Sequence, residues 1–496
     1  MNQAVAEYLK LAQEKINQNK WQEAQVNFQK AIQIQPNRWD LYFNLGAVFL
    51  KQQQYQEAAK YFQQAILIKP EHDKSYNNLG TALLKLEQTD NAVKAFSQAV
   101  ALNQQEPQFY YNLGEALVQQ GLIDRALICF RQAVKLDPQD HQLQFRLGKS
   151  FRNQGLNQEA ITCFCRAIEL NPTYSPAYIS LRYVDLKLEL CNRLISFYRQ
   201  ILVKHPNLSD ALTNLAEVLT YQGNLAEAIS ISRRAIYIKT VNNHPDLAQA
   251  NWSVKKKQAP DFIIIGAGKC GTTSLYNYLG YHPQVLLPNK KELRFFDKNF
   301  AYGYEWYLAQ FPAISDRRDL ITGEASPSYF FLPHVAQRIR DFAPDIKLIV
   351  MLRNPVERSI SDYYQNKKTG RNHQSLLEVI KRETERFKQK TELELSYHGG
   401  PLLQSLYYYK LKRWLKIFPK EQLLIIKSEN FFNNTAQSMQ QVFEFLNLSN
   451  IAIDNYQTYN IGSYSQVGED IQEQLSNFFE PHNKRLEEYL EIIFNW

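Results

Sequence analysis

Small and apolar residues recur through the first half of the chain with the spacing of paired amphipathic helices, and the pattern returns every 34 residues. A small residue is followed four places later by an aromatic at Ala24/Phe28, Ala58/Phe62, Ala92/Phe96, Ala126/Phe130 and Ala160/Phe164. Leu-Gly pairs and closing prolines recur at the same step. Because one helix pair cannot bury its apolar face alone, this period predicts units that stack on one another. We expect seven helical repeats across residues 5–242.

The 34-residue pattern resembles the tetratricopeptide repeat. This resemblance implies an all-α superhelix in which each repeat is a pair of antiparallel helices. The glycine of the first helix and the alanine of the second lack bulk, so the helices can approach closely, and a proline ends the second helix. Such arrays present a concave groove to peptides or proteins, so we expect a protein or peptide partner. A spacer or a dimerisation arm is the alternative interpretation.

The last two repeats depart from the pattern. Arg182 replaces the glycine of the sixth repeat, and Ser232 replaces the aromatic of the seventh. Drift of this kind near the end of an array suits a repeat that packs on another part of the protein. Residues 243–259 then break the period with Pro245 and a run of three lysines at 255–257, so we expect a linker there.

After residue 259 the pattern changes to short apolar runs separated by helical segments. The runs at 262–265, 347–352 and 423–426 are continuous and rich in branched residues, as buried parallel strands are. Strands that alternate with helices predict an α/β domain with a central parallel sheet, which we expect over 260–496. Ligands of such sheets bind just beyond the carboxyl ends of the strands.

A glycine-rich loop follows the first predicted strand directly. Its glycines let the backbone approach an anion closely, and the helix that follows would direct free N–H groups at the same point. The lysine stands two places before the last glycine, which is the wrong register for a Walker A loop. An ordinary strand-to-helix turn is the alternative. The candidate anion-binding residues are Gly268, Lys269, Cys270, Gly271, Thr272, Thr273 and Ser274.

The order Lys-x-Gly-Thr-Thr in this loop resembles the 5′-phosphosulfate loop of sulfotransferases that use 3′-phosphoadenosine 5′-phosphosulfate (PAPS). Those enzymes bind the 3′-phosphate of PAPS with an arginine after a later strand and a serine eight residues on. Arg353 and Ser361 stand at that place and spacing, and a guanidinium suits a phosphate because it donates two parallel hydrogen bonds. The two motifs identify 260–496 as a P-loop-like sulfotransferase domain that resembles the heparan-type carbohydrate sulfotransferases.

Sulfuryl transfer needs positive charge near the leaving oxygen and a base for the acceptor. Lys269 is our candidate for the charge, so we expect no metal. The Lys-Glu-x-x-Phe-Phe segment at 291–296 resembles a segment of carbohydrate sulfotransferases whose glutamate is the base, which makes Glu292 our candidate. A solvated surface turn is the alternative for this segment, and Asp362 and His334 are weaker candidates for the base.

Two further segments extend the resemblance. Residues 323–329 resemble a family segment that lines the active cleft, with Ala325 where many carbohydrate-acting members carry lysine. Residues 460–464 resemble the C-terminal signature, in which relatives often place a basic residue near Ser463 to contact the nucleotide. Without that basic residue, either the nucleotide contact is weaker or the backbone makes it.

Composition narrows the remaining choices. A net charge of +8 without a dense basic run gives no reason to expect nucleic acid as a partner. The five cysteines show no CxxC pair, so neither a disulfide framework nor a zinc site is indicated. The first residues show neither a basic nor an apolar segment of a secretion signal, and no apolar run is long enough for a membrane span, so we expect neither feature. We therefore expect a cytoplasmic protein.

These expectations combine into one function. The chain would transfer a sulfuryl group from PAPS to a hydroxyl or amine of a sugar, a protein or a small molecule, while the repeats recruit the acceptor or a partner. The alternative is a protein-binding scaffold whose sulfotransferase-like domain is inactive. A nucleotide kinase is a third reading, against which the register of the glycine-rich loop argues. The identity of the acceptor and the oligomeric state are left open.

Overall fold

The structure is a computed structural model. It describes residues 2–185, 187–252, 259–315, 319–368, 374–395, 399–453, 456 and 467–496. The chain divides into two compact units, Met1–Pro206 and Asn207–Trp496.

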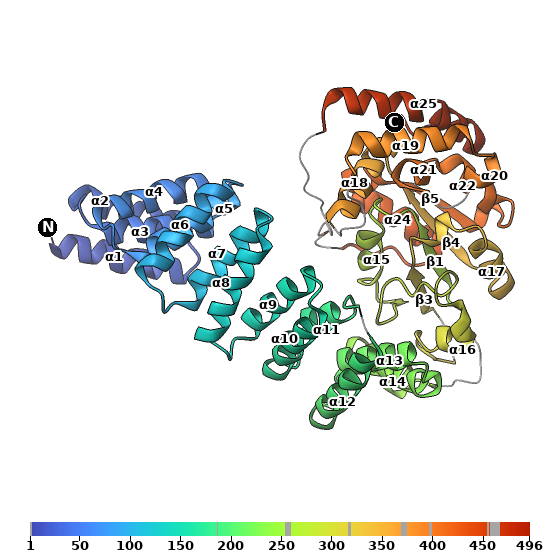
Figure 1. The fold of residues 1–496 in the computed structure, drawn as a ribbon, viewed down its shortest axis with the longest axis horizontal. Coiled ribbons are helices and arrows are strands. Elements are labelled where there is room, and N and C mark those ends of the chain that lie inside the picture. The colour runs from blue at the N-terminus through green and yellow to red at the C-terminus, as the bar shows by residue number, and fades with distance from the viewer. Residues whose placement is uncertain are drawn as a thin grey trace. The chain divides into compact units, whose positions relative to one another are not determined.

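The first unit is a series of helix pairs, one pair for each 34-residue repeat (Figure 1). Its helices are α1 (Asn2–Asn17), α2 (Trp21–Ile34), α3 (Trp39–Lys51), α4 (Tyr55–Ile68), α5 (Asp73–Lys85), α6 (Thr89–Leu102), α7 (Pro107–Gln119), α8 (Ile123–Leu136), α9 (His141–Asn153), α10 (Asn157–Leu170), α11 (Ser175–Leu181) and α12 (Leu188–Lys204). In the first five repeats each helix packs against its pair partner, and adjoining pairs pack on one another; α11 and α12 of the sixth repeat both contact α10. The predicted array of tetratricopeptide-type repeats is confirmed.

The glycine and the aromatic of each regular repeat fit together. A Cβ atom added at Gly80 would lie 2.7 Å from the ring of Phe96 in the second helix of the same repeat, and Phe96 is buried. The same contact occurs at Gly46/Phe62, Gly114/Phe130 and Gly148/Phe164. The close approach expected from the sequence is therefore made by a phenyl ring against a glycine of the first helix, and the ring fills the space that the glycine leaves.

The second unit contains a five-stranded sheet in the order β2-β3-β1-β4-β5, and every neighbouring pair is parallel. The strands are β1 (Phe262–Gly266), β2 (Val285–Leu286), β3 (Ile321–Ala325), β4 (Lys347–Leu352) and β5 (Leu423–Lys427). In the middle of the sheet, Ile263 pairs with Glu324 on one side and with Leu348 on the other. The predicted central parallel sheet is confirmed, and β2 and β3 add to the three strands expected from the apolar runs.

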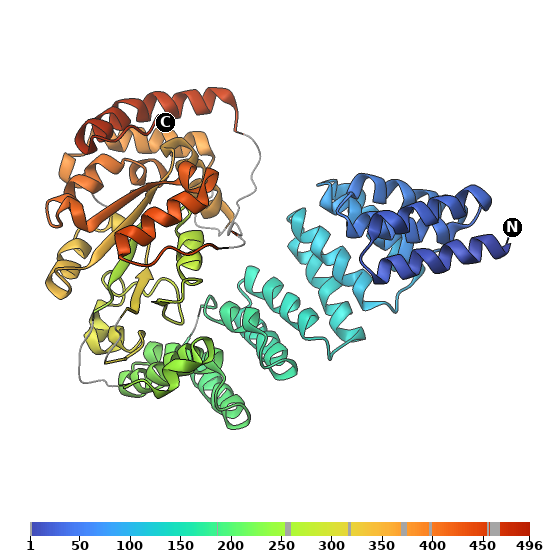
Figure 2. The same ribbon diagram turned by 180° about the vertical axis from the view of Figure 1, so that it is seen from behind.

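Most helices of the second unit flank this sheet, whereas its first two helices, at residues 209–243, lie beside the helix at 303–308 (Figures 1 and 2). They are α13 (Ser209–Gln222), α14 (Leu225–Asn243), α15 (Thr272–Leu279), α16 (Gly303–Leu308), α17 (Val335–Phe342), α18 (Pro355–Lys368), α19 (Leu376–Lys388), α20 (Glu392–Leu395), α21 (Pro401–Gln404), α22 (Tyr407–Leu415), α23 (Ser428–Asn433), α24 (Thr435–Leu446) and α25 (Glu469–Leu490). The fully buried Trp414 of α22 belongs to the same hydrophobic core as the strands. Burial on both faces explains why the central strands read as continuous apolar runs.

The seventh repeat, α13 and α14, is part of the second unit. Leu225 and Ile229 of α14 pack against the core that surrounds the sheet. The indole N–H of Trp306 in α16 donates to the hydroxyl of Thr220 in α13 over 2.9 Å. The expectation that a drifting repeat packs on another part of the protein is therefore confirmed for the seventh repeat.

The segment after α14 was expected to be a linker. A short 3-10 helix at Pro245–Gln249 follows α14, and Trp252 forms an isolated antiparallel bridge with Ile314. Residues 253–258, with the three lysines, lie outside the described residues, as does the 460–464 segment with Ser463. The domain boundaries predicted at 242 and 260 stay predictions.

Strand β3 carries a carboxyl group inside the core. Glu324 is fully buried and accepts hydrogen bonds from the hydroxyls of Tyr307 at 2.9 Å, Tyr329 at 3.1 Å and Ser326 at 2.7 Å. Burial raises the pKa of Glu324 to about 7, and the hydrogen bonds from the three hydroxyls act in the opposite direction. The carboxyl group therefore titrates near neutrality inside the sheet.

The glycine–phenylalanine contact predicts the effect of a larger side chain in the repeats. Replacing Gly80 by valine should destabilise the repeats by about 1–3 kcal/mol, because the new side chain would overlap the buried ring of Phe96. Thermal unfolding followed by circular dichroism would measure this change. Thr81→Ala on the same helix is the matched control and should change the stability by less than about 0.5 kcal/mol. Equal melting curves for the two variants would contradict the packing argument.

The buried carboxyl group predicts a pH-dependent stability. The folded pKa of Glu324, about 7, lies above the usual value of a glutamate, so its contribution to stability is fully present at low pH and is lost as the pH rises through neutrality. Glu324→Gln keeps the shape without the charge. The melting temperature of the wild type should therefore fall relative to that of the variant between pH 5 and pH 8, because the wild type loses on the order of 3 kcal/mol of stability at most over this range. Parallel melting temperatures across this range would contradict the assignment, and the exposed Glu305→Gln serves as control.

Candidate functional site

The glycine-rich loop lies at the carboxyl end of β1, the central strand, where it turns into α15. Lys269 and Gly271 both have left-handed backbone conformations, with φ of +71° and +94°. A side chain at Gly271 would be strained by this conformation and would also lie 2.8 Å from the ring of Phe432. Helix α15 begins at Thr272, and the first N–H groups of a helix point out of its N-terminus. They face the end of the sheet where ligands of parallel sheets bind.

One side of the loop is open. Beside Gly268, no heavy atom of the described residues lies within 4 Å of the place that a Cβ atom would take. The predicted residues Thr272 and Ser274 have buried side chains, and so has Cys270. Burial raises the pKa of the Cys270 thiol to about 11, so the thiol stays neutral. A contact of this cysteine with an anion would fall to its backbone.

A buried arginine holds the loop. Arg358 of α18 is 1% exposed, and its Nε donates to the backbone oxygen of Gly268 over 3.1 Å. Its other nitrogens donate to the backbone oxygen of Pro401, the hydroxyl of Ser405, the amide oxygen of Gln404 and the carboxylate of Asp362. A buried guanidinium with this many acceptors is well satisfied. It therefore fixes the loop after β1 to the helix that follows β4.

Arg353 stands at the carboxyl end of β4, next to the loop. Its backbone oxygen accepts a hydrogen bond from the hydroxyl of Tyr407 over 2.8 Å. Its guanidinium is 30% exposed and forms an ion pair with Glu357 at 3.2 Å. Strands β1 and β4 are neighbours in the sheet, and the chain order reverses between them. The predicted Arg353 and the predicted loop therefore share the switch point at which open parallel sheets bind ligands.

Ser361 lies on the face of α18 that meets the loop. Arg358, Asp362 and Gln365 mark this face, because residues three, four and seven apart line one side of a helix. Arg358 contacts the backbone of the loop, and Gln365 accepts a hydrogen bond from Nζ of Lys269 over 3.3 Å. Ser361 is three residues after Arg358 and four before Gln365. The structure thus brings the predicted Lys269 and Ser361 to the same side of the sheet.

The Lys-Glu-x-x-Phe-Phe segment reaches the loop from the other side. Nζ of Lys291 donates to the hydroxyl of Thr273 over 3.0 Å and lies 3.4 Å from Oε1 of Glu292. Burial lowers the pKa of Lys291, and the charge of Glu292 opposes this shift. Half of the Glu292 side chain is exposed. Lys291 therefore connects the candidate base to the glycine-rich loop, and the exposed half of the Glu292 side chain is accessible to a ligand.

The backbone of this segment is held in an uncommon conformation. Glu292 and Arg294 have φ of +64° and +51°, a region that residues other than glycine seldom occupy. The N–H of Glu292 donates to the backbone oxygen of Ala325, and the N–H of Arg294 donates to the hydroxyl of Ser326, both over 3.0 Å. The carboxyl end of β3 thus fixes the segment. Backbone that is strained and fixed by its surroundings is frequent at functional sites.

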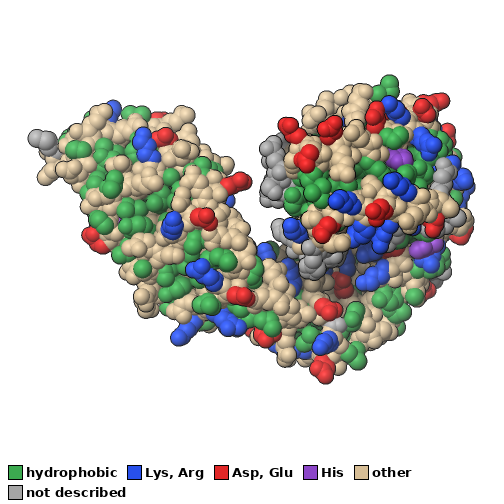
Figure 3. Space-filling view, turned by 45° about the horizontal axis from the view of Figure 1, so that its top comes forward, with side chains coloured by type: hydrophobic (Ala, Val, Ile, Leu, Met, Phe, Trp, Pro, Cys, Tyr) green, Lys and Arg blue, Asp and Glu red, His purple; other side chains and the backbone are tan. Residues whose placement is uncertain are grey.

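Two residues of this site were not singled out from the sequence. Lys291 adjoins the candidate base, but only its contact with Thr273 reveals that it bridges the base and the loop. Arg358 stands five residues after Arg353 in the same motif, and its burial against the loop depends on contacts with α21. Of the weaker base candidates, Asp362 is engaged by Arg358 at 3.1 Å. Basic side chains gather on the face of this unit that Figure 3 shows.

The comparisons with known proteins match this arrangement. The family described as the cilia and flagella-associated protein 70 C-terminal domain matches residues 2–251, and the sulfotransferase domain family matches residues 259–479. Mouse heparan sulfate glucosamine 3-O-sulfotransferase 5 is 31% identical over 48% of this chain and 75% of its own length. The membrane-associated sulfotransferase kil1 of Dictyostelium discoideum is 27% identical over 48% of this chain and 66% of its own length.

Other matches cover different shares of the chain. Human heparan sulfate glucosamine 3-O-sulfotransferase 3B1 is 33% identical over 41% of this chain and 50% of its own length. The chain thus spans about half to two thirds of the length of several relatives. A solved sulfotransferase from Alicyclobacillus acidocaldarius is 32% identical over 48% of this chain and 98% of its own, with a TM-score of 0.41.

The described residues bear on two earlier expectations. Among these residues, none of the helices combines the length and the apolar character that a bilayer span requires. Within the same ranges, His, Cys, Asp and Glu side chains do not gather in groups of three or more that would ligate a metal. The expectation that the reaction needs no metal stays a prediction.

The repeats, the sheet with its loop and the matches along both halves of the chain lead to one assignment. The chain joins two families: residues 2–251 belong to the family of the cilia and flagella-associated protein 70 C-terminal domain, and residues 259–479 belong to the sulfotransferase family.

Proposed function

We propose that the chain transfers a sulfuryl group from PAPS to a hydroxyl or amine acceptor. The observation that carries this proposal is the hydrogen bond from Arg358 to Gly268. It joins the loop after β1 to the helix after β4, so that the two candidate phosphate-binding groups, the loop and Arg353 with Ser361, lie at the same end of the sheet. A cofactor with phosphate groups at both its 3′ and 5′ positions matches such a pair.

The residues of the loop fit a phosphosulfate group. The first N–H groups of α15 would donate hydrogen bonds to the 5′-phosphosulfate at the open side of Gly268, with Lys269 beside it. Arg353 and Ser361 would bind the 3′-phosphate, and a guanidinium can do so with two parallel hydrogen bonds. The candidate cofactor-binding residues remain Gly268, Lys269, Cys270, Gly271, Thr272, Thr273, Ser274, Arg353 and Ser361.

The proposed transfer is a single displacement at the sulfur, assisted by Glu292 and Lys269. The acceptor oxygen or nitrogen would form a bond to the sulfur while the bond between the sulfur and the bridging phosphate oxygen breaks. Glu292 would take the proton of the acceptor, and 3′-phosphoadenosine 5′-phosphate would leave. Lys269 would stabilise the charge that develops on the leaving oxygen, because a fixed cation acts strongly where water is excluded.

The proposed class of acceptor is inferred from the names of the relatives and from Ala325. Several relatives are named for heparan sulfate glucosamine, which favours a carbohydrate hydroxyl or amine over a protein side chain. Ala325, buried at the end of β3, stands where many carbohydrate-acting members carry lysine. We therefore expect a sugar acceptor that differs from heparan sulfate.

The first unit would recruit a protein or peptide partner, as tetratricopeptide arrays do. The five cysteines are free thiols, which supports a reducing compartment such as the cytoplasm. An inactive scaffold would bind its partner without turnover, whereas an active enzyme would release 3′-phosphoadenosine 5′-phosphate from PAPS.

The two cationic residues should have separate roles. Arg353→Ala should weaken the binding of 3′-phosphoadenosine 5′-phosphate on the order of 30-fold, because it removes a charged hydrogen-bond donor worth about 2 kcal/mol. Lys269→Ala should lower turnover by about 10²-fold or more and affect nucleotide binding less. Isothermal titration calorimetry and a radiolabelled PAPS assay would measure the two effects. Equal, mild effects of both changes would refute this division, and a preference for ATP would refute the cofactor.

Glu292 should act on the acceptor rather than on the nucleotide. Glu292→Gln should lower kcat by about 10²- to 10⁴-fold, because general-base catalysis contributes that much, while the nucleotide binds as before. The labelled PAPS assay with a glucosamine-containing oligosaccharide would measure kcat. Glu305→Gln, an exposed change in the same unit, should leave kcat unchanged. Full activity of the Glu292 variant would assign the base elsewhere.

A further inference from the structure

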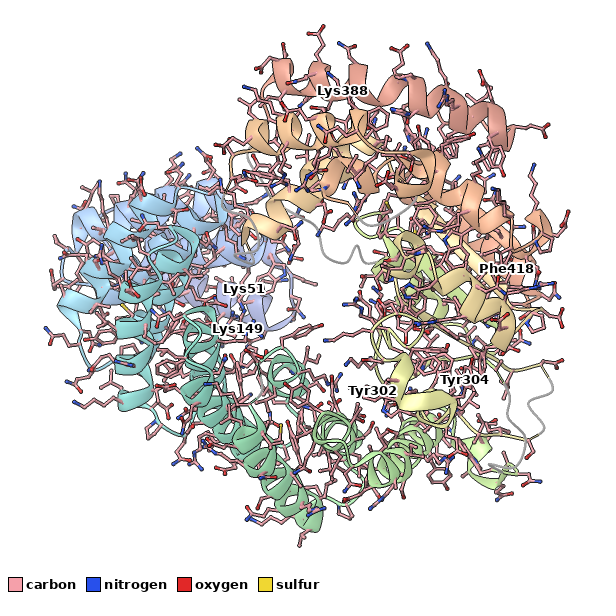
Figure 4. All side chains as sticks on the ribbon, turned by 45° about the vertical axis from the view of Figure 1, so that its right-hand side comes forward. Lys51, Lys149, Tyr302, Tyr304, Lys388 and Phe418 are labelled. Carbon is pink, nitrogen blue, oxygen red and sulfur yellow. The ribbon has the colours of Figure 1, made fainter. Side chains whose placement is uncertain are left out.

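A cavity of about 250 Å³ lies between the seventh repeat and the segment that carries Glu292. Helices α13 and α14 form one wall through residues that include Thr213, Tyr221 and Ser232. The other wall includes Asn289, Glu292 and Trp306. Figure 4 labels Tyr302, which also lines the cavity and lies beside α16 near the helices of the seventh repeat. A helical repeat and the candidate base thus share one cavity.

Hydrogen bonds fix the repeat to the opposite wall. The amide nitrogen of Asn289 donates to the hydroxyl of Thr213 over 2.9 Å, and Lys290 forms an ion pair with Glu217. The side-chain amide nitrogen of Gln310 donates to the hydroxyl of Ser232 over 3.3 Å. These contacts come from different turns of α13 and α14. The wall formed by the repeat is therefore a fixed part of the second unit.

The cavity coincides with the place where the seventh repeat departs from the pattern. In the regular repeats a glycine of the first helix packs against a phenylalanine ring of the second, as Gly80 does against Phe96. The corresponding residues of the seventh repeat are Ala216 and Ser232, and both line the cavity. The substitution of serine for the aromatic leaves room at a position where the other repeats bury a ring.

Glu292 connects the cavity to the glycine-rich loop. This residue lines the cavity, and Lys291 joins its carboxylate to Thr273 of the glycine-rich loop. An acceptor group in the cavity would therefore meet the candidate base next to the site proposed for the phosphosulfate.

The lining indicates the chemistry of the occupant. The buried oxygen Oδ1 of Asn289 has no hydrogen-bond partner among the described residues, so it is an acceptor for a hydroxyl or amine hydrogen. The amide groups of Asn299 and Gln310 and the rings of Tyr302 and Trp306 also line the cavity. A volume of 250 Å³ is at or below the lower end of ligand pockets, which suits one ring and not a whole chain. A sugar ring, with hydroxyls on its edge and an apolar face, fits this lining better than a tyrosine side chain with a single hydroxyl.

We propose that the seventh repeat forms one wall of the acceptor site, which selects a single ring-sized unit rich in hydroxyl or amine groups. This inference rests on the proposed sulfotransferase function. The repeat array then has two roles in one chain: its last pair selects the acceptor, while the preceding pairs are left for a partner.

The test restores the aromatic of the repeat pattern. Ser232→Phe in the full-length protein should fill the cavity, so binding of a short glucosamine-containing oligosaccharide should be lost while 3′-phosphoadenosine 5′-phosphate binds as in the wild type. Calorimetric titrations with each ligand, the sugar being added to the nucleotide-bound protein, measure both effects. Ser230→Phe is the matched control, because Ser230 is exposed on α14, and it should change neither titration.

A second variant covers the case in which Ser232→Phe does not fold. Tyr221 is 58% exposed, so Tyr221→Ala should keep the fold and weaken sugar binding about tenfold. Tyr183, 75% exposed in the sixth repeat, supplies the control Tyr183→Ala, which should bind the sugar as the wild type does.

The outcomes separate this inference from the proposed function. Sugar binding that neither cavity variant changes would place the acceptor elsewhere and overturn the inference. Binding of the nucleotide without the sugar, or of a tyrosine-containing peptide in its place, would overturn the acceptor class. Failure of the wild type to bind the nucleotide would contradict the proposed function itself, and the inference would fall with it.

Discussion

The arrangement of the candidate site in the second unit depends on one buried charge, the guanidinium of Arg358. Arg358 is almost completely removed from water, and burial of a guanidinium is costly unless its N–H groups all find acceptors. Its acceptors come from the glycine-rich loop, from α21 and from its own helix. Satisfying this one side chain therefore fixes three segments at once. The positions of Lys269, Arg353 and Ser361 relative to one another follow from that constraint.

Much of the fold could be read from the sequence because its causes are local. The residue pair that makes the Gly80/Phe96 contact recurs in each regular repeat, and three strands are unbroken apolar runs. Strand β3 was not predicted because Gly323 and Glu324 interrupt its apolar character. Glu324 can be buried because the hydroxyls of Tyr307 and Tyr329 donate hydrogen bonds to it. Strand β2 has only two residues and therefore no pattern of its own.

The residues of the candidate site likewise fall into those that the sequence predicts and those that only the structure reveals. Lys269 and Arg353 belong to short motifs beside predicted strands, so their place at the carboxyl end of the sheet follows from the sequence. The roles of Lys291 and Arg358 depend on contacts between distant segments, which spacing along the chain does not encode. Ser232 signalled that the seventh repeat differs, but only the structure reveals the cavity that this difference leaves.

The order of the strands has a consequence for synthesis on the ribosome. Each pair of the first unit contacts its neighbours in sequence, so the array can fold once a few adjacent pairs have emerged. The central strand β1 must instead wait for Lys347 to pair with Phe262, and the seventh repeat waits with it for Trp306 and Gln310. During that interval the apolar side of α14 is exposed next to an already folded array. The second unit therefore exposes apolar surface for longer during synthesis than the first unit does.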